Sequence, residues 1–245
     1  MILVCCYNTH MENHKNQKIN TPTAIIVAGF LVMLAILITN GGGKLGNTTN
    51  KDKTLSEQVG VNKEKFATCI KEVDTTALQT KISTSVESAM KGLPQEERGT
   101  PYSVIIGKNG VKTEIRGALP IEEVNKLIAE VTAGKVTTAY TGEIVLSEEG
   151  DHILGNPDAP IVVIEYSDYE CPYCKNFDAT MKQIVTESDG NVAWIYRHWP
   201  IHQGSFEKLV AAECVAKLKG NDAFWKYSEL LFGLLNPTPA PSTNL

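Results

Sequence analysis

Apolar residues in this chain occur either in continuous runs or at the spacing of one helix face, and each pattern predicts a different element. The run 161–164 is entirely apolar and predicts a buried strand that continues to about Ser167. In 175–187 the apolar residues recur at helical spacing, so we expect a helix directly after that strand. Its apolar face consists of Phe177, Met181, Ile184 and Val185.

A second strand and two more helices follow this strand–helix unit. Residues 194–197 predict a central strand, and 205–218 and 223–235 predict amphipathic helices. Three large aromatic residues accompany them, and we expect these to fill the core of a helical subdomain, because large aromatic side chains are mostly buried. They are Trp199, Phe224 and Trp225. The alternative is that they line a groove for peptides.

The region before these elements predicts helices, then a hairpin, then another helix. Residues 53–90 carry apolar residues at helical intervals. Residues 102–107 and 111–116 predict two strands, and the Asn-Gly dipeptide at 109–110 is a strong signal for a two-residue hairpin turn. Pro120 then opens a helix. The intervening stretch up to His152 is polar and contains a short extended run at 143–146.

Two cysteines stand between the apolar strand and its helix, in the order Cys171-Pro172-Tyr173-Cys174. This position places the Cys171 sulfur at a helix N-terminus, where unpaired N–H groups and the positive end of the helix dipole favour a thiolate. Cys174 is close enough in sequence to form a disulfide with Cys171. We therefore interpret the pair as a dithiol/disulfide redox couple, with Cys171 as nucleophile and Cys174 as resolving cysteine.

A zinc site is the alternative interpretation of a CxxC pair. Structural zinc needs a second pair of ligands at comparable spacing. The other cysteines form no such pair outside the extreme N-terminus; they are Cys5, Cys6, Cys69 and Cys214. His198 and His202 are separated by Pro200, which prevents them from sharing a helical face. The redox interpretation is therefore preferred.

An uninterrupted apolar run, 24–38, lies near the N-terminus. We interpret 23–40 as an uncleaved transmembrane signal-anchor, because no A-x-A cleavage pattern follows it. The alternative is a cleaved signal peptide. Lysines flank the run on both sides, so charge does not fix its orientation. The CxxC pair favours an extracytoplasmic domain, since disulfides persist outside the cytoplasm.

Composition bounds the remaining function classes. The 245 residues are 42% hydrophobic and 21% charged, which suits one domain of moderate size plus appendages. The formal net charge of −5 provides no basic footprint for nucleic acid. Glycines 41–43 are not followed by the strand–helix context of a phosphate loop. We therefore expect no cofactor, no metal and no nucleic-acid partner.

The motifs around the CxxC pair resemble the DsbA-like branch of the thioredoxin superfamily. The resemblance rests on 155–160 (Gly-Asn-Pro-Asp-Ala-Pro), on 161–174, and on 196–200 (Tyr-Arg-His-Trp-Pro). It implies that the first cysteine attacks and the second resolves. It also implies that Glu165, six residues before the first cysteine, helps move the resolving proton. The Pro-Tyr dipeptide lacks the histidine found in the strong oxidants of the family, which implies a milder potential.

The earlier region resembles the C-terminal half of the same domain. The matching residues are 61–69 (Val-Asn-Lys-Glu-Lys-Phe-x-x-Cys), 99–101 (Gly-Thr-Pro), the hairpin and the helix after it. In the family, the bond before that proline is cis and packs on the active-site disulfide, which implies these roles for Thr100 and Pro101. Because this half comes first here, we expect a circularly permuted domain. The alternative is a truncated gene whose first half is a degenerate repeat.

The resemblance also bears on the remaining cysteines. Cys69 and Cys214 lie on apolar helical faces and match family positions where cysteines are often found. They form either a second, structural disulfide or two buried free thiols, since cysteine packs well as a small hydrophobe.

The expected fold class is α/β, a thioredoxin-like fold with an inserted helical subdomain, circularly permuted and preceded by one transmembrane helix. We divide the chain into a cytoplasmic tail (1–22), the anchor (23–40), a linker (41–54), the half with helices, cis-proline and hairpin (55–133), a second linker (134–152), the CxxC half (153–236) and a disordered tail (237–245).

These features together predict a membrane-anchored extracytoplasmic oxidoreductase that forms disulfides in exported proteins with free thiols. A membrane redox partner would reoxidise it. Two other functions stay open: a reductase or isomerase using the same cysteines, and a truncated, redox-inactive interaction module.

Overall fold

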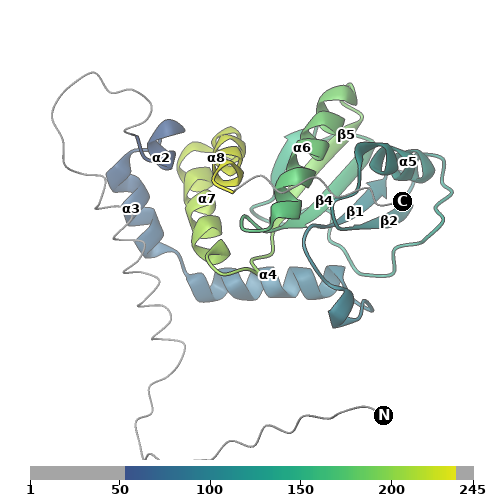
Figure 1. Cartoon of the computed structure of the whole chain (residues 1–245), viewed down its shortest axis with the longest axis horizontal. Helices are drawn as coiled ribbons and strands as arrows, with labels where there is room; N and C mark the ends of the chain where they lie inside the picture. The colour runs from purple at the N-terminus through teal and green to yellow at the C-terminus, as the bar shows by residue number, and fades with distance from the viewer. Residues whose placement is uncertain (1–52, 236–245) are drawn as a thin grey trace, which may run out of the picture. The chain divides into compact units, whose positions relative to one another are not determined.

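The computed structural model describes residues 53–235 (Figure 1). Within this range no helix is long and apolar enough to cross a membrane. The predicted cytoplasmic tail (1–22), signal-anchor (23–40) and C-terminal tail (237–245) lie outside the described residues, as does nearly all of the linker 41–54.

One mixed sheet contains strands from both halves of the sequence. Its order is β2-β1-β4-β5-β3. The strands are β1 (Tyr102–Gly107), β2 (Lys112–Arg116), β3 (His152–Gly155), β4 (Ile161–Ser167) and β5 (Val192–His198). β4 and β5 are parallel and the other neighbours are antiparallel. Because β1 pairs directly with β4, the two halves share a single sheet. With its helices, this sheet gives the α/β class that the sequence predicts.

The hairpin and the strands β4 and β5 form where the sequence predicts them, whereas the edge strand β3 was not predicted. The extended run 143–146 is irregular, with Val145 and Leu146 more than half exposed. The edge strand is instead β3, whose His152 lies opposite Tyr196 of β5. A four-residue strand with a glycine at its end carries too weak a local pattern to be recognised, and only its pairing with β5 defines it.

Local capping divides the helical stretch 53–90 into three helices. These are α2 (Leu55–Gln58), α3 (Lys63–Glu72) and α4 (Thr75–Ala89). Thr54 forms a capping box with Glu57, and the side chains of Asn62 and Asp74 accept hydrogen bonds from backbone N–H groups in the first turns of α3 and α4. The remaining α-helices are α5 (Ile121–Thr132), α6 (Pro172–Glu187), α7 (Ser205–Lys219) and α8 (Asn221–Gly233).

Helices cover both faces of the sheet. α4 packs on one face, where Val86, Ala89 and Met90 meet side chains of the three central strands. These strand residues are Tyr102, Val104, Ile106, Ile164, Tyr166 and Ile195. α5 and α6 contact each other and the sheet, and strand alternation assigns them to the opposite face. Every residue of β1 and β5 is accordingly buried.

The helical subdomain lies beside the sheet. α7 and α8 lie side by side, with α3 packed on α7 (Figure 1). A disulfide joins Cys69 of α3 to Cys214 of α7, so the free-thiol alternative for these residues does not apply. Phe224 and Trp225 are buried here as core residues. Trp199 differs from the expectation, because it is half-buried against the cluster under α4.

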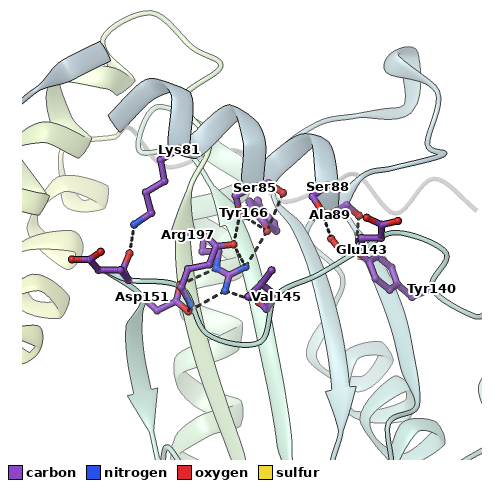
Figure 2. Close-up of polar contacts among 12 residues, drawn as sticks. Lys81, Ser85, Ser88, Ala89, Tyr140, Glu143, Val145, Asp151, Tyr166 and Arg197 are labelled. Atoms are coloured by element: carbon purple, nitrogen blue, oxygen red, sulfur yellow. Dashed lines mark hydrogen bonds and ion pairs between the residues drawn. The ribbon is translucent and has the colours of Figure 1, made fainter. Parts of the chain in front are cut away.

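The connecting segment, residues 134–151, is fixed to the domain by polar contacts (Figure 2). Arg197 of β5 bonds both carboxylate oxygens of Asp151 at 2.8 and 3.0 Å and the Val145 carbonyl oxygen at 2.8 Å. Arg197 also forms an ion pair with Glu148 at 2.8 Å. Tyr140 donates its hydroxyl to the Ala89 carbonyl at 2.7 Å. The predicted polar linker is therefore a packed part of the structure.

We expect Arg197→Met to lower the free energy of unfolding by about 3–5 kcal/mol, because it leaves the carboxylate of Asp151 buried without its partner. Arg116→Met is the matched control. Arg116 also pairs with two carboxylates, but its side chain is 48% exposed, so the loss should stay below about 1 kcal/mol. Urea unfolding measures the free energy of unfolding of both variants. Equal losses would show that the buried contacts of Arg197 to the connecting segment stabilise the fold no more than an exposed ion pair does.

Candidate active site

Cys171 and Cys174 lie where β4 passes into α6. Cys171 occupies the N-cap position and Pro172 the first turn of α6, where the missing N–H of proline costs nothing. The Cys171 N–H donates to the Asp168 carbonyl at 3.1 Å, and this turn directs the chain from strand to helix. Both cysteines are free thiols, 2% and 0% exposed. The CxxC pair is thus at the helix N-terminus that the sequence pattern predicts.

The environment of Cys171 favours its thiolate. A hydrogen bond from the Cys174 thiol is the largest influence, and together with Thr100 and the backbone N–H groups of Cys174 and Tyr173 it lowers the pKa of Cys171 to about 6. Burial acts in the opposite direction but is outweighed. A fraction of Cys171 well above one half is therefore thiolate at neutral pH.

Cys174 has the opposite character. Burial, followed by the hydrogen bond to Cys171 and the charge of Glu165, raises the pKa of Cys174 far above its usual range. One thiol of the pair is thus nucleophilic and the other holds its proton. This is the division of roles expected of an attacking and a resolving cysteine.

The earlier half of the chain reaches this site at Thr100. The peptide bond between Thr100 and Pro101 is cis. In its protonated form the Cys171 thiol donates to the Thr100 carbonyl oxygen, with 3.3 Å between sulfur and oxygen. The Thr100 hydroxyl is buried and has no hydrogen-bond partner within residues 53–235, so it is available to the thiolate. The structure therefore brings Thr100 and Cys171 together across 71 positions of sequence.

Glu165 lies on β4, within electrostatic reach of both cysteines, and is completely buried. It is flanked by Ser103 of β1 and Tyr196 of β5, and neither carboxylate oxygen has a hydrogen-bond partner among the described residues. Burial is the main cause that raises the pKa of Glu165 to about 8, and the charge of Asp178 adds to it. Glu165 is therefore mostly protonated at neutral pH and can donate a proton.

Asp168 is a site residue that sequence reasoning missed. It is 1% exposed and accepts hydrogen bonds from the N–H groups of Glu170, Ile201 and His202, and from the side chains of His202 and Ser205. Although burial opposes ionisation, these bonds lower the pKa of Asp168. The carboxylate thereby holds the turn before Cys171 against the loop 199–205. The Ser-Asp pair at the end of the strand was the available signal, but apart from Glu170 the partners of Asp168 lie over thirty residues away.

Among residues 53–235, no group of three potential metal ligands includes Cys171 or Cys174.

Comparison with known proteins identifies the region around this site. The sequence model of the thioredoxin family matches residues 147–234. Disulfide bond formation protein D of Bacillus subtilis (strain 168) is 34% identical over 90 residues, covering 35% of this chain and 40% of the relative. The Na(+)/H(+) antiporter NhaA 1 of Mycobacterium sp. (strain KMS) is 39% identical over 71 residues, covering 28% of this chain and 12% of the relative.

A solved structure is also similar to part of this chain. The oxidised BdbD from Bacillus subtilis is 33% identical, with a TM-score of 0.33, over 38% of this chain and 51% of that chain. This chain spans about an eighth of the length of the antiporters and less than half of the disulfide bond formation protein. Residues 147–234 thus match the thioredoxin family, and the similarity to disulfide bond formation protein D agrees with the DsbA-like resemblance seen in the motifs of this half.

The pKa difference between the two cysteines predicts their alkylation rates. In the reduced protein, iodoacetamide should label Cys171 with a rate that rises through a midpoint near pH 6, because the thiolate is the reactive form. Cys174 should react far more slowly. Peptide mapping after timed quenching separates the two, and Cys171→Ser should abolish the fast phase. A midpoint near 9, or faster labelling of Cys174, contradicts the assignment.

Burial of Glu165 predicts a pH-dependent cost to stability. Its pKa is about 8 in the folded protein against 4.5 as the reference value, so the folded form retains a proton that the unfolded chain releases. Stability is therefore lost as the pH rises from about 4.5 to 8. Glu165→Gln removes this dependence.

Denaturant unfolding of the oxidised proteins across that pH range tests the prediction, since Cys171 and Cys174 do not titrate when joined. As the pH rises, the free energy of unfolding of the variant should increase relative to that of the wild type by on the order of a few kcal/mol. Parallel stability curves would mean that Glu165 ionises normally.

Proposed function

We propose that this protein is a membrane-anchored, extracytoplasmic thiol–disulfide oxidoreductase that forms disulfides in exported proteins through Cys171 and Cys174. The proposal rests on the opposite pKa shifts of the two thiols, lowered for Cys171 and raised for Cys174. The reduced site is stabilised by a thiolate on Cys171 at the N-terminus of α6, which favours giving up the disulfide to a substrate.

The exchange runs in two displacements. A substrate thiolate attacks Cys171 Sγ, which breaks the Cys171–Cys174 bond and forms a mixed disulfide, with Cys174 as the leaving group. A second substrate thiolate then attacks the substrate sulfur of that mixed disulfide and releases the Cys171 thiolate. The substrate gains a disulfide and the enzyme receives two electrons. A membrane redox partner that accepts these electrons would restore the starting state.

Glu165 is proposed as the proton donor to Cys174. When Cys174 leaves as a thiolate, its high pKa favours uptake of a proton, and the protonated Glu165 is a buried acid within electrostatic reach of it. The complete burial of the Glu165 carboxyl supports this role, because burial keeps the carboxyl protonated near neutral pH.

The order of the halves is proposed to be a circular permutation. β1 pairs with one edge of β4, and the Thr100 carbonyl oxygen accepts a hydrogen bond from Cys171. The earlier half therefore supplies the parts that the CxxC half lacks. The connecting segment joins the two halves and is fixed by Arg197 and by α4. An isolated CxxC half would leave the edge of β4 unpaired, which favours aggregation. The alternative is a truncated gene with a degenerate first repeat.

The location is proposed from two features. The predicted anchor at 23–40 would hold the chain in the membrane. The Cys69–Cys214 disulfide supports an oxidising compartment for the domain, since structural disulfides are rare in the cytosol. A reductase or isomerase acting outside the cytoplasm is the second candidate, and a redox-inactive module is the third.

Trapping experiments separate these functions. In producing cells, Cys174→Ser should accumulate mixed disulfides through Cys171, because the resolving thiol is absent, and carbonate extraction should leave them in the membrane pellet. Cys171→Ser is the matched control and should trap nothing. The purified wild type, oxidised beforehand, should also form disulfides in reduced unfolded ribonuclease. Absence of both trapping and oxidation would support the redox-inactive module.

A further inference from the structure

Three potential metal ligands converge in a part of the domain that the thiol chemistry does not use. They are His152 of β3, His198 of β5 and Glu213 of α7. Glu213 Oε1 lies 2.8 Å from His152 Nε2 and 2.9 Å from His198 Nε2. All three donor atoms lie within 4.8 Å of one another. They are the single such group among residues 53–235.

The backbone and the aromatic core fix these side chains. His152 lies opposite Tyr196 in the β3–β5 ladder, so His198, two residues further, projects from the same face of the sheet. The His152 ring stacks on Phe224 with 3.4 Å between centroids and 10° between planes. Both histidines are buried, at 5% and 7% exposure. The orientation of both rings is therefore set before any ligand arrives.

Glu213 is positioned by the disulfide next to it. Cys214, its neighbour in α7, is bonded to Cys69, so this turn of α7 cannot move away from α3. The side chain of Glu213 is 26% exposed, in contrast to the histidines at 6% each. The triad is thus a buried pair of imidazoles with a carboxylate at the solvent side, which leaves an entry for an ion and for a coordinated water.

A cavity beside the triad carries an excess of negative charge. Besides the triad, its ionic lining consists of three carboxylates and two cations, which are Glu148, Glu149, Asp151, Lys81 and Arg197. Arg197 is engaged with Asp151 and Glu148, and Lys81 with the Glu149 carbonyl oxygen. With Glu213 included, four carboxylates face two cations, so the local field attracts a divalent cation.

We propose that His152, His198 and Glu213 form a binding site for a divalent transition metal, of which Zn²⁺ fits best. Two imidazole nitrogens and one carboxylate oxygen are zinc ligands, and a water from the cavity would complete a tetrahedron. Metal–ligand distances of about 2.0–2.1 Å place tetrahedral ligand atoms about 3.3 Å apart. To admit the ion, the two contacts to Glu213 Oε1 need to open by about half an ångström, and the two histidine nitrogens, which lie within 4.8 Å of each other, need to settle at the same ~3.3 Å spacing.

The alternative is a purely hydrogen-bonded triad, in which both Nε2–H groups donate to Glu213. In the metal-bound form each ring instead carries its proton on Nδ1 and binds through Nε2. The ion would connect β3, β5 and α7 at one point, so its binding should stabilise the fold. This inference concerns a site separate from Cys171 and Cys174 and does not depend on the proposed function.

The test uses the full chain in its oxidised form, alkylated so that no free thiol competes for metal. His10 and His14, which are four residues apart in the sequence, are replaced by Gln in the reference protein to remove N-terminal donors. Titration with Zn²⁺ should give one equivalent bound per chain and a higher midpoint of thermal unfolding. Cobalt(II) should give the visible bands of a tetrahedral nitrogen and oxygen site without a thiolate charge-transfer band.

Glu213→Gln, which keeps an oxygen acceptor for both histidines, should lower zinc affinity by at least about tenfold, since even the loss of an outer-shell partner weakens metal sites ~10–100-fold. Glu207→Gln, on the same helix, is the matched control and should bind as the reference does. No zinc binding, or equal affinity in both variants, overturns the proposal in favour of the hydrogen-bonded triad. If Glu213→Gln does not fold, the cobalt spectrum of the reference protein decides: octahedral bands, or none, overturn the proposal.

Discussion

The pairing of β1 with β4 is the interaction on which the rest of this structure depends. It joins two halves of the sequence into one sheet, places Ser103 beside Glu165, and brings Thr100 to within 3.3 Å of the Cys171 sulfur. The apolar side chains on one face of these strands are covered by α4, and α5 and α6 cover the other. Cys171 therefore lies against a contact that only the assembled domain can supply.

The chemistry of the site follows from unequal hydrogen bonding of neighbouring buried groups. Cys171 is at the open end of α6 and receives hydrogen bonds that lower its pKa, whereas Cys174 and Glu165 are enclosed and their pKa values rise. A buried carboxyl costs stability, and Glu165 carries that cost within electrostatic reach of Cys174. Strongly shifted pKa values of this kind gather at functional sites, which is the ground on which Glu165 is proposed as a proton donor.

Local sequence signals predicted the elements around the CxxC pair well, because each carries its own pattern. The apolar run before Cys171, the Asn-Gly turn at 109–110 and the helix after Pro172 are of this kind. The missed features depend on distant partners. β3 exists through its pairing with β5, the connecting segment is held by Arg197, and Asp168 and the His152–His198–Glu213 triad are assembled from separate elements. No single stretch of sequence encodes such contacts, although the resemblance of 99–101 to a family motif anticipated the cis bond before Pro101.

The reduction potential of the Cys171–Cys174 pair, equilibrated against glutathione, tests the central claim most directly. The pKa of Cys171, about 6, lies between those of thioredoxin, about 7, and DsbA, about 3.5. Since stabilising the thiolate stabilises the reduced form, the potential should fall between their values of about −270 and −120 mV. A potential at or below about −270 mV would contradict a disulfide-forming role and identify a reductase instead.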